Sequence, residues 1–204
     1  MREIIIATRN RGKTAEIRDI LSLGDVVLSD LHDIDFTDEI EENGETFEEN
    51  ALIKAETLFR VCGRPVIADD SGLVVPHLNG EPGVRSARYA GSDASDEDNN
   101  KLLLAKLSKA VGSEREAFFH CVAVFYTGPG QYRTAEGKVH GAIALEAAGS
   151  GGFGYDPLFY VARYKKTMAQ LYSAEKNRIS HRGTAFSVLK EYIRAYLAGF
   201  DAVE

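Results

Sequence analysis

Apolar runs and polar segments alternate in the first third of the chain in a pattern typical of alternating strands and helices. Residues 4–7 are a β-branched run that predicts a buried strand. Apolar residues at helical spacing predict one helix over residues 14–23 and another over residues 47–62. The next apolar run, residues 66–68, predicts a short buried strand that is stopped by a turn at Ser71-Gly72. This order indicates an α/β fold.

Two polar segments carry the signal that starts a helix. Thr46 and Glu49 have the spacing of a capping box, in which each side chain bonds to the backbone N–H of the other residue. Ser95 and Asp98 repeat this arrangement before a set of apolar positions that predicts a helix to about residue 111.

The second half of the chain predicts mainly strands. Residues 118–126 form a strongly apolar strand, and a turn at Gly128-Pro129-Gly130 leads to possible strands at 131–135 and 139–145. Strands that are joined by short turns pair antiparallel, so we expect a mixed sheet. The remaining apolar segments predict a strand at 158–161, a helix at 168–175 and a final amphipathic helix after residue 183.

Length, charge and cysteine content narrow the class of protein. We expect residues 1–204 to form a single domain of two lobes. A net charge of −7 argues against binding to duplex DNA, which requires a dense basic face. No apolar run approaches the roughly 18 residues of a membrane span, and the N-terminus does not resemble a signal peptide. Cys62 and Cys121 lie alone in apolar runs, which fits reduced thiols in the cytosol.

Asp69 and Asp70 are the first candidates for chemistry. They follow the apolar run 66–68, and ligands of α/β sheets bind at the carboxyl ends of the strands. Two carboxylates at this place could hold a hard cation such as Mg²⁺, act as the base for a water molecule, or do both. The alternative is that they only cap a turn.

A polar loop with a glycine, Thr8 to Lys13, joins the first predicted strand to the first predicted helix. This layout is typical of a phosphate site, because backbone N–H groups and the positive end of the helix face the anion. Thr8 and Asn10 could donate hydrogen bonds to a phosphate, and Lys13 adds positive charge. The GxxxxGK[ST] pattern of a Walker loop is absent, and a solvated loop is the alternative.

Charged side chains also lie around the start of the second helix. Acids crowd residues 38–45, and such a run is usually a solvated face, although one of these acids could reach a metal. Asn50 and Lys54 are four residues apart at the border of the apolar helix face. Lys54 could be half-buried and directed into a cleft, or its ammonium group could extend into solvent.

Two later segments could bind the remainder of a nucleotide. Residues 149–157 combine four glycines with two aromatic residues, so the backbone could approach a flat ligand and a ring could stack on it. Asp156 could accept hydrogen bonds from a base edge, unless this segment is only a hairpin loop. Residues 176–183 are basic and precede the final helix, which makes them a second possible anion site. Taken alone, His181 and Arg182 would be interpreted as surface residues.

Together these clusters resemble the inosine triphosphate pyrophosphatase family, which removes deaminated purine nucleotides. The matching stretches follow the order of the family along nearly the whole chain: ATRNRGK (7–13), TFEENALIKA (46–55), IADDSGL (67–73), GEPGVRSARYAG (80–91), GGFGYDP (151–157) and KNRISHRG (176–183). The chain departs from the family at Arg9, where members often carry glycine and where they vary.

The resemblance implies a fold and an activity. The fold would be a long central mixed sheet flanked by helices, with two lobes around a substrate cleft, in a cytoplasmic homodimer that binds neither duplex nucleic acid nor a membrane. The activity would be Mg²⁺-dependent hydrolysis of ITP, dITP and XTP to the monophosphate and pyrophosphate. A related pyrophosphatase for another modified nucleotide is the alternative, and a non-catalytic nucleotide-binding module is a third hypothesis.

The resemblance also implies roles for individual residues. The groups that would contact the phosphates are Thr8, Asn10, Arg11, Gly12, Lys13 and Lys54. Asp70 would bind metal or act as the base, Glu42 would help to hold Mg²⁺, and Ser71 would touch the substrate. The residues that would stack on the purine or shape its pocket are Phe153, Gly154, Tyr155 and Asp156. Those that would recognise the base or its 6-oxo group are Lys176, His181 and Arg182.

Overall fold

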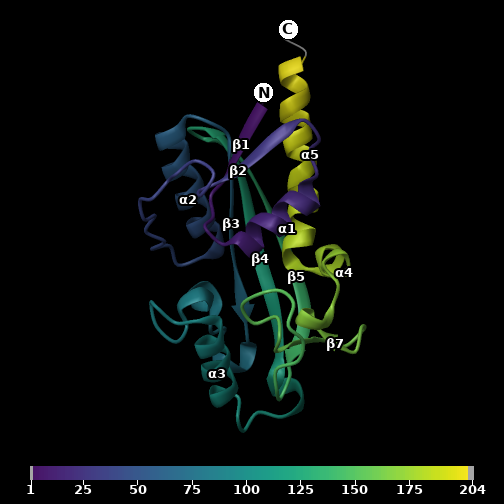
Figure 1. The fold of residues 1–204 in the computed structure, drawn as a ribbon. Helices are drawn as coiled ribbons and strands as arrows, with labels where there is room; N and C mark the ends of the chain where they lie inside the picture. Colours follow the sequence, from purple (N-terminus) through teal and green to yellow (C-terminus); the bar gives the residue numbers. More distant parts are fainter. Residues whose placement is uncertain (1, 202–204) are drawn as a thin grey trace. The chain divides into compact units, whose positions relative to one another are not determined.

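The computed structural model describes residues 2–201 and contains one mixed β-sheet with flanking α-helices (Figure 1). The strands are β1 (Arg2–Ile6), β2 (Val26–Asp30), β3 (Val66–Val74), β4 (Glu116–Gly128), β5 (Gln131–Ile143), β6 (Phe159–Val161) and β7 (Lys166–Thr167). The α-helices are α1 (Arg11–Leu21), α2 (Phe47–Cys62), α3 (Asp96–Lys106), α4 (Ser173–Ile179) and α5 (His181–Asp201). Met1 and residues 202–204 lie outside the described residues. The predicted domain 1–204 includes all four of them, and the N-terminal segment in which a signal peptide was sought includes Met1.

The sheet has the strand order β2-β1-β3-β4-β5-β6-β7. β1 pairs in parallel with β2 and with β3, and β6 pairs antiparallel with β5 and with β7. Parallel and antiparallel pairs of strands therefore occur in one sheet. This arrangement confirms the predicted α/β fold with a mixed sheet.

Two predicted strand boundaries are wrong. β3 does not stop at Ser71-Gly72 but continues to Val74, because Leu73 is fully buried in an apolar core and its N–H donates to the hydroxyl group of Ser86. β5 is one strand where two were predicted at 131–135 and 139–145. Exposed Glu136 and Lys138 alternate with buried positions, so the pattern of a half-buried strand continues across the expected break.

Helix boundaries differ from the prediction for reasons of capping. α1 begins at Arg11 instead of residue 14, because the Asn10 side chain accepts a hydrogen bond from the N–H of Lys13 and acts as the N-cap. α3 ends at Lys106 instead of about residue 111, since the carbonyl group of Leu107 accepts a hydrogen bond from Arg115. The capping box of Thr46 and Glu49 starts α2 as predicted.

The last basic segment is helical rather than a loop. Residues 168–175 were predicted as one helix, but they form a 3-10 turn, Met168–Gln170, and then the start of α4. Lys176 lies within α4 and His181 begins α5, so only Ser180 separates the two helices. The prediction of a basic loop before the final helix is therefore wrong, although the final amphipathic helix itself is confirmed.

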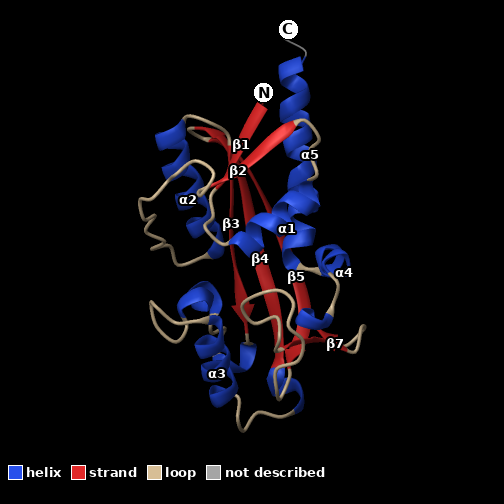
Figure 2. Ribbon diagram, viewed as in Figure 1, coloured by secondary structure: helices blue, strands red, loops and turns tan. Residues whose placement is uncertain are grey.

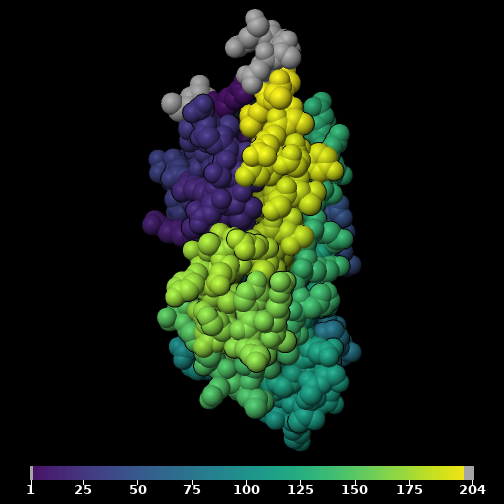
Figure 3. Space-filling model, turned by 90° about the vertical axis from the view of Figure 1, so that its right-hand side faces the viewer, coloured from purple at the N-terminus to yellow at the C-terminus, as the bar shows by residue number. Residues whose placement is uncertain are grey.

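The chain divides into two compact units, and the boundaries cross β3, β4, β5 and α5. Unit 1 comprises the residues up to Asp70, Cys121–Gly137 and the residues from Arg182 onward, and unit 2 comprises Ser71–His120 and Lys138–His181. In unit 1, α1 and α5 cover one face of the strands and α2 covers the other (Figure 1). The described N-terminal segment, coloured purple, lies beside α5, coloured yellow, in Figure 3. There the ammonium group of Lys190 bonds to the carbonyl group of Ile20.

Unit 2 has an apolar core of its own. Leu103 and Leu107 of the α3 region pack there with Phe119, Phe159 and other buried residues. The described residues thus form three apolar clusters, one on each face of the strands of unit 1 and one in unit 2. Within residues 2–201, the helices are too short or too polar to span a bilayer.

Candidate functional site

The loop between β1 and α1 is shaped by its own polar side chains. The Thr8 hydroxyl oxygen accepts a hydrogen bond from the N–H of Asn10 at 3.1 Å, and the Asn10 side-chain oxygen accepts one from the N–H of Lys13 at 3.0 Å. These bonds leave the hydroxyl hydrogen of Thr8 and the amide N–H₂ of Asn10 available as donors. The predicted phosphate-binding residues therefore hold a defined turn at the N-terminus of α1, with Arg11 and Gly12 in its first turn.

Asp69 and Asp70 lie on opposite faces of the sheet, because successive side chains of a strand alternate. Asp69 faces α1 and α5, where its carboxylate lies 3.0 Å from the Lys13 ammonium group. Asp70 faces α2, where its carboxylate lies 3.4 Å from the Lys54 ammonium group and accepts a hydrogen bond from Asn50 at 3.3 Å. The acid pair thus belongs to two different polar clusters.

The surroundings of Asp69 and Asp70 shift the pKa values of the two acids in opposite directions. Burial by itself would raise the pKa of Asp69, but the positive charges of Lys13, Arg182 and Lys54 together hold it below its ordinary value. Burial raises the pKa of Asp70 above its ordinary value, although Lys54 and Lys13 oppose this shift. Because a base works best when its pKa approaches the working pH, Asp70 is the better candidate for that role.

Lys54 is buried between two carboxylates. Its ammonium group lies 2.8 Å from Glu42 and 3.4 Å from Asp70, and only 7% of the residue is exposed. Burial would lower the pKa of Lys54, but these two acids raise it above the ordinary value, so the side chain stays charged. The alternative that the Lys54 ammonium group extends into solvent is therefore wrong, because the side chain is buried against two acids.

Glu42 and Asp70 were predicted as metal ligands, and they meet at Lys54. Within the part of the chain that is described, no group of three or more His, Cys, Asp or Glu side chains could hold a metal. Mg²⁺ is usually bound by one or two carboxylates together with waters and the phosphates of a substrate, rather than by a cage of protein ligands. Two carboxylates that meet at one lysine fit this kind of site.

Arg182 lies with Asp69. Its guanidinium group donates to Glu16 at 2.6 Å and to Asp69 at 3.4 Å, and 1% of the residue is exposed. Arg182 therefore ties α5 to α1 and β3 within unit 1, whereas Lys176 and His181, which were predicted to share its role, belong to unit 2.

Asp156 organises the candidate purine loop in unit 2. Its carboxylate accepts hydrogen bonds from the N–H of Phe153 and from the Lys176 ammonium group, and Asp156 and Lys176 are both buried. The Lys176 nitrogen lies 4.7 Å from the centre of the Phe153 ring. Asp156 is thus committed to holding Phe153 and Lys176 together, a role that the sequence did not suggest.

Helix α3 holds the same loop at Gly154. Asp96 accepts a hydrogen bond from the N–H of Gly154 at 2.6 Å, and Asn100 donates one to its carbonyl group at 2.9 Å. The hydroxyl group of Tyr155 donates to the carbonyl group of Ser86. Asp96 and Asn100 were missed by the sequence reasoning, although their spacing of four places them on one helix face.

His181 and Ser71 are the remaining predicted residues of unit 2. The His181 ring stacks on Phe119 with a centroid distance of 4.8 Å, and His181 is buried. Ser71 is half-buried in β3, directly after Asp70. The interpretation of His181 and Arg182 as surface residues is therefore wrong, because both are buried and the His181 ring stacks on Phe119 of the apolar core of unit 2.

Gly152 and Gly154 offer a matched test of the loop. Both have positive φ angles, +74° and +62°, so alanine at either position should cost about 1 kcal/mol in backbone strain. An added Cβ at Gly152 would lie 2.0 Å from the Asp156 carboxylate, whereas the atoms described around Gly154 leave its Cβ free. We expect Gly152→Ala to cost about 2 kcal/mol more than Gly154→Ala, because Asp156 would lose its bonds. Urea unfolding of both variants measures this difference, and equal losses would contradict it.

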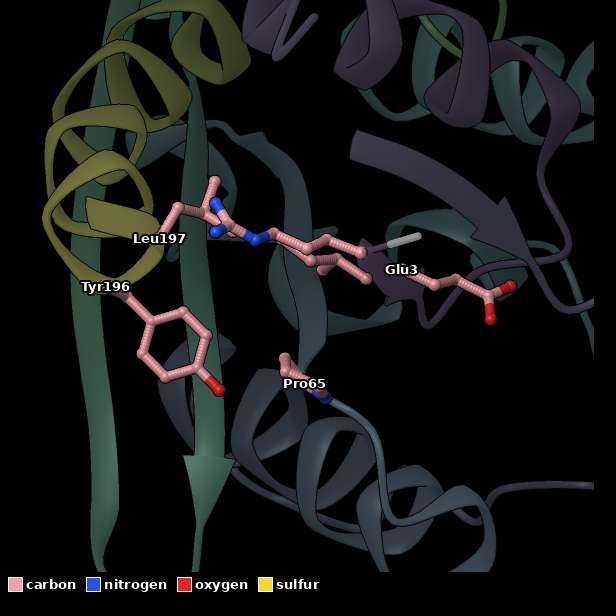
Figure 4. Close-up of a pocket in the computed structure, with 6 residues that line it drawn as sticks. Glu3, Pro65, Tyr196 and Leu197 are labelled. Carbon is pink, nitrogen blue, oxygen red and sulfur yellow. The ribbon is translucent and has the colours of Figure 1, made fainter. Parts of the chain in front are cut away.

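A separate hollow lies in unit 1, between α5 and the start of β1. Tyr196 and Leu197 of α5 face Pro65 across it, and Glu3 lies at its side (Figure 4). None of the predicted site residues lines this hollow. The candidate functional residues therefore lie in the two polar clusters around β3 and in the glycine-rich loop of unit 2, and not in this hollow.

Comparison with known proteins agrees with the resemblance that was inferred from the motifs. The model of the Ham1 family matches residues 4–192. A relative from Geobacter sulfurreducens named dITP/XTP pyrophosphatase is 47% identical, over 95% of this chain and 97% of its own length. A relative of the same name from Bacillus subtilis is 46% identical, over 96% and 98% of the two chains.

Solved structures show the same similarity. A HAM1 protein from Coxiella burnetii has a TM-score of 0.86 at 41% identity, and the match covers 96% of this chain and all of that one. The Ham1 protein of Staphylococcus aureus has a TM-score of 0.84 at 43% identity with the same coverage. Sequence and structure agree over nearly the full length, and the chain therefore belongs to the Ham1 family.

Proposed function

We propose that this protein is a nucleoside triphosphate pyrophosphatase that removes deaminated purines from the nucleotide pool. It would hydrolyse ITP, dITP and XTP to the nucleoside monophosphate and pyrophosphate. The observation that carries this proposal is the position of Asp70, a buried carboxylate with a raised pKa that lies beside the Lys54 ammonium group. The names of the relatives from Geobacter sulfurreducens and Bacillus subtilis support the choice of substrates.

The phosphates would bind in unit 1. Thr8 and Asn10 shape the loop before α1, and their remaining donors, together with the backbone N–H groups of Arg11 and Gly12, would face the anion. Lys13 and Lys54 would add positive charge, because a triphosphate needs several cations to balance its charge. Both lysines are held by carboxylates, Lys13 by Asp69 and Lys54 by Asp70 and Glu42.

Glu42 and Asp70 would hold Mg²⁺ together with oxygens of the substrate. When bound, the ion would neutralise charge on the phosphoryl oxygens. The two carboxylates lie 2.8 and 3.4 Å from the Lys54 ammonium group, so they already balance a positive charge.

Asp70 would act on the attacking water. Its carboxylate would orient the water and accept its proton, while the oxygen of the water forms a bond to phosphorus and the bond between the α- and β-phosphates breaks. Lys54 would stabilise the charge that develops on the phosphoryl oxygens. Asp69 is a weaker base, because neighbouring cations keep its pKa low.

The purine would bind in unit 2. Phe153 would stack on the ring, with Ser71, Gly154, Tyr155 and His181 around it. Lys176, whose nitrogen lies over the Phe153 ring, would donate to a 6-oxo group. It cannot accept a hydrogen bond from the 6-amino group of adenine, so ATP would be rejected. Arg182 is the less suitable donor, because its guanidinium group already bonds to Glu16 and Asp69.

A panel of triphosphates tests this proposal. With Mg²⁺ in excess, we expect pyrophosphate release from ITP, dITP and XTP at kcat/KM values at least about a hundredfold above those for ATP and GTP. Separate detection of phosphate and pyrophosphate identifies the bond that is cleaved. Comparable turnover of all common triphosphates would contradict the specificity. Turnover of a modified pyrimidine nucleotide alone would favour a related pyrophosphatase, and binding of ITP without turnover would favour a binding module.

We extend the proposal to assembly and location on the basis of the family. The protein would act as a homodimer in the cytoplasm, where Cys62 and Cys121, both free thiols, would stay reduced. Sedimentation at micromolar concentration measures the assembly, and a monomer under these conditions would contradict it.

A further inference from the structure

Arg9 connects two segments of the candidate site. It lies in the loop between β1 and α1. Its guanidinium group donates hydrogen bonds to the carbonyl groups of Phe36 at 3.2 Å and Asp38 at 2.6 Å, and it lies 5.7 Å from the centre of the Phe36 ring. In return, the carbonyl group of Arg9 accepts a hydrogen bond from the His32 ring at 3.1 Å.

The segment that Arg9 holds is the acidic loop, residues 31–46, which joins β2 to α2 (Figure 2). Near its start, Asp30 accepts hydrogen bonds from the N–H groups of His32 and Asp33, and the Thr14 hydroxyl group of α1 donates to the same acid. These bonds fix the first residues of the acidic loop to α1.

The far end of the acidic loop is fixed to α2. The side chain of Asn50 bonds to both the N–H and the carbonyl group of Gly44, and Glu49 accepts hydrogen bonds from the N–H groups of Glu45 and Thr46. Between the two ends, Arg9 anchors residues 36–38, and Glu42 then reaches Lys54. Arg9 thus anchors the middle of the loop, where Ile34 and Phe36 also pack against the apolar core of unit 1.

The hydrogen bonds from Arg9 to the acidic loop should persist over a wide pH range. The acceptors are backbone carbonyl groups, so the bonds do not depend on the ionisation of the surrounding acids. Arginine stays charged at all working pH values, and its planar fork can donate to two acceptors while it lies near a ring. Lysine offers a point charge without this geometry, and glycine offers no donor at all.

We propose that Arg9 is a positioning residue that holds the acidic loop against the phosphate loop, so that Glu42 stays within reach of Lys54 and of the Mg²⁺ that the substrate brings. The consequence for catalysis rests on the proposed function, in which Thr8, Asn10 and Lys13 bind phosphate and Glu42 binds the metal. The attachment itself does not depend on that function.

Arg9→Gly tests the catalytic consequence. Loss of two hydrogen bonds should raise the KM for ITP and the half-saturating Mg²⁺ concentration by about tenfold, with a change in kcat of less than about threefold. Arg9→Lys should recover part of this loss. Arg60→Ala is the control, because Arg60 is exposed on α2 and bonds only to Glu56 among the contacts described, so both constants should stay at the wild-type values.

Amide hydrogen exchange of the nucleotide-free protein provides a readout without activity. Residues 36–43 should exchange faster in Arg9→Gly than in the wild type, whereas α2 should be unchanged. Unchanged exchange in both Arg9 variants would overturn the proposal. Faster exchange with unchanged KM and Mg²⁺ dependence would overturn the positioning role. A wild-type protein that cleaves no triphosphate would refute the proposed function, and the exchange experiment would still decide whether Arg9 holds the loop.

Discussion

Replacement of Asp70 by asparagine should lower pyrophosphate release from ITP by about a thousandfold, because the amide cannot accept a proton from water. The variant should remain folded. Burial raises the pKa of Asp70, so the ionised acid weakens the wild-type fold as the pH rises above about 4, the unfolded value. A neutral amide avoids this loss but also removes one acid from Lys54, which keeps Glu42, so the melting temperature at neutral pH should stay close to that of the wild type. Steady-state kinetics and thermal unfolding measure both effects, and activity within tenfold of wild type would contradict the role of Asp70.

Asp69→Asn is the matched control on the opposite face of the same strand. Neighbouring cations lower the pKa of Asp69, so its stabilising effect is present above about pH 4 and is lost as the pH falls further. Removal of this negative charge takes a buried carboxylate away from Lys13 and leaves Arg182 with Glu16, which should cost about 3 kcal/mol at pH 7. Urea unfolding at pH 7 and pH 3 should show that the difference from wild type shrinks in acid. An equal loss of stability in Asp70→Asn would contradict the distinction between the two acids.

Replacement of Lys176 by methionine should lower kcat/KM for ITP by about a hundredfold, because a charged donor to the 6-oxo group is lost. Discrimination against ATP should fall with it, since ATP never used this donor. The same change leaves the buried Asp156 carboxylate without its cation, which should cost about 3–5 kcal/mol in stability. Kinetics with ITP and ATP at a temperature well below the unfolding transition measure the first effect.

A double variant separates recognition from stability. Lys176→Met combined with Asp156→Asn removes both charges of the buried pair, and the asparagine oxygen can still accept the hydrogen bond from the N–H of Phe153. We expect most of the stability to return while the preference for ITP over ATP stays low. A double variant that regains the preference would show that Lys176 does not recognise the base.

Sequence patterns predicted an element correctly where the residues within it, without distant partners, determine its structure. The capping box of α2 is an example, because Thr46 and Glu49 bond to each other's backbone within one turn. β2 was not predicted, since its last residues are polar. Ser29 and Asp30 are buried there because their side chains bond to Glu3 and Thr14, partners that are distant in sequence. The false end of β3 has the same origin, because Ser71-Gly72 resembles a turn until Leu73 is seen in the core.

The sequence identified residues of the candidate site, but it did not predict most of the contacts between them. Lys54 and Asp70 were singled out, and the structure brings them together with Glu42. The sequence did not predict that the side chains of Asp69 and Asp70 lie on opposite faces of the sheet, because the strand was expected to end next to them. One partner of Arg182 is Glu16, 166 residues away, and such a pair depends on the packing of α5 against α1.

The two hydrogen bonds from α3 to Gly154 have a thermodynamic consequence. They restrain the peptide groups next to Phe153 before any nucleotide arrives, so the entropy of ordering this segment is lost during folding and not during association. A stacked base would then meet an already rigid platform, and its affinity would not be reduced by the immobilisation of a flexible loop. Calorimetry should accordingly register an unfavourable association entropy that is smaller in the wild type than in Asn100→Ala.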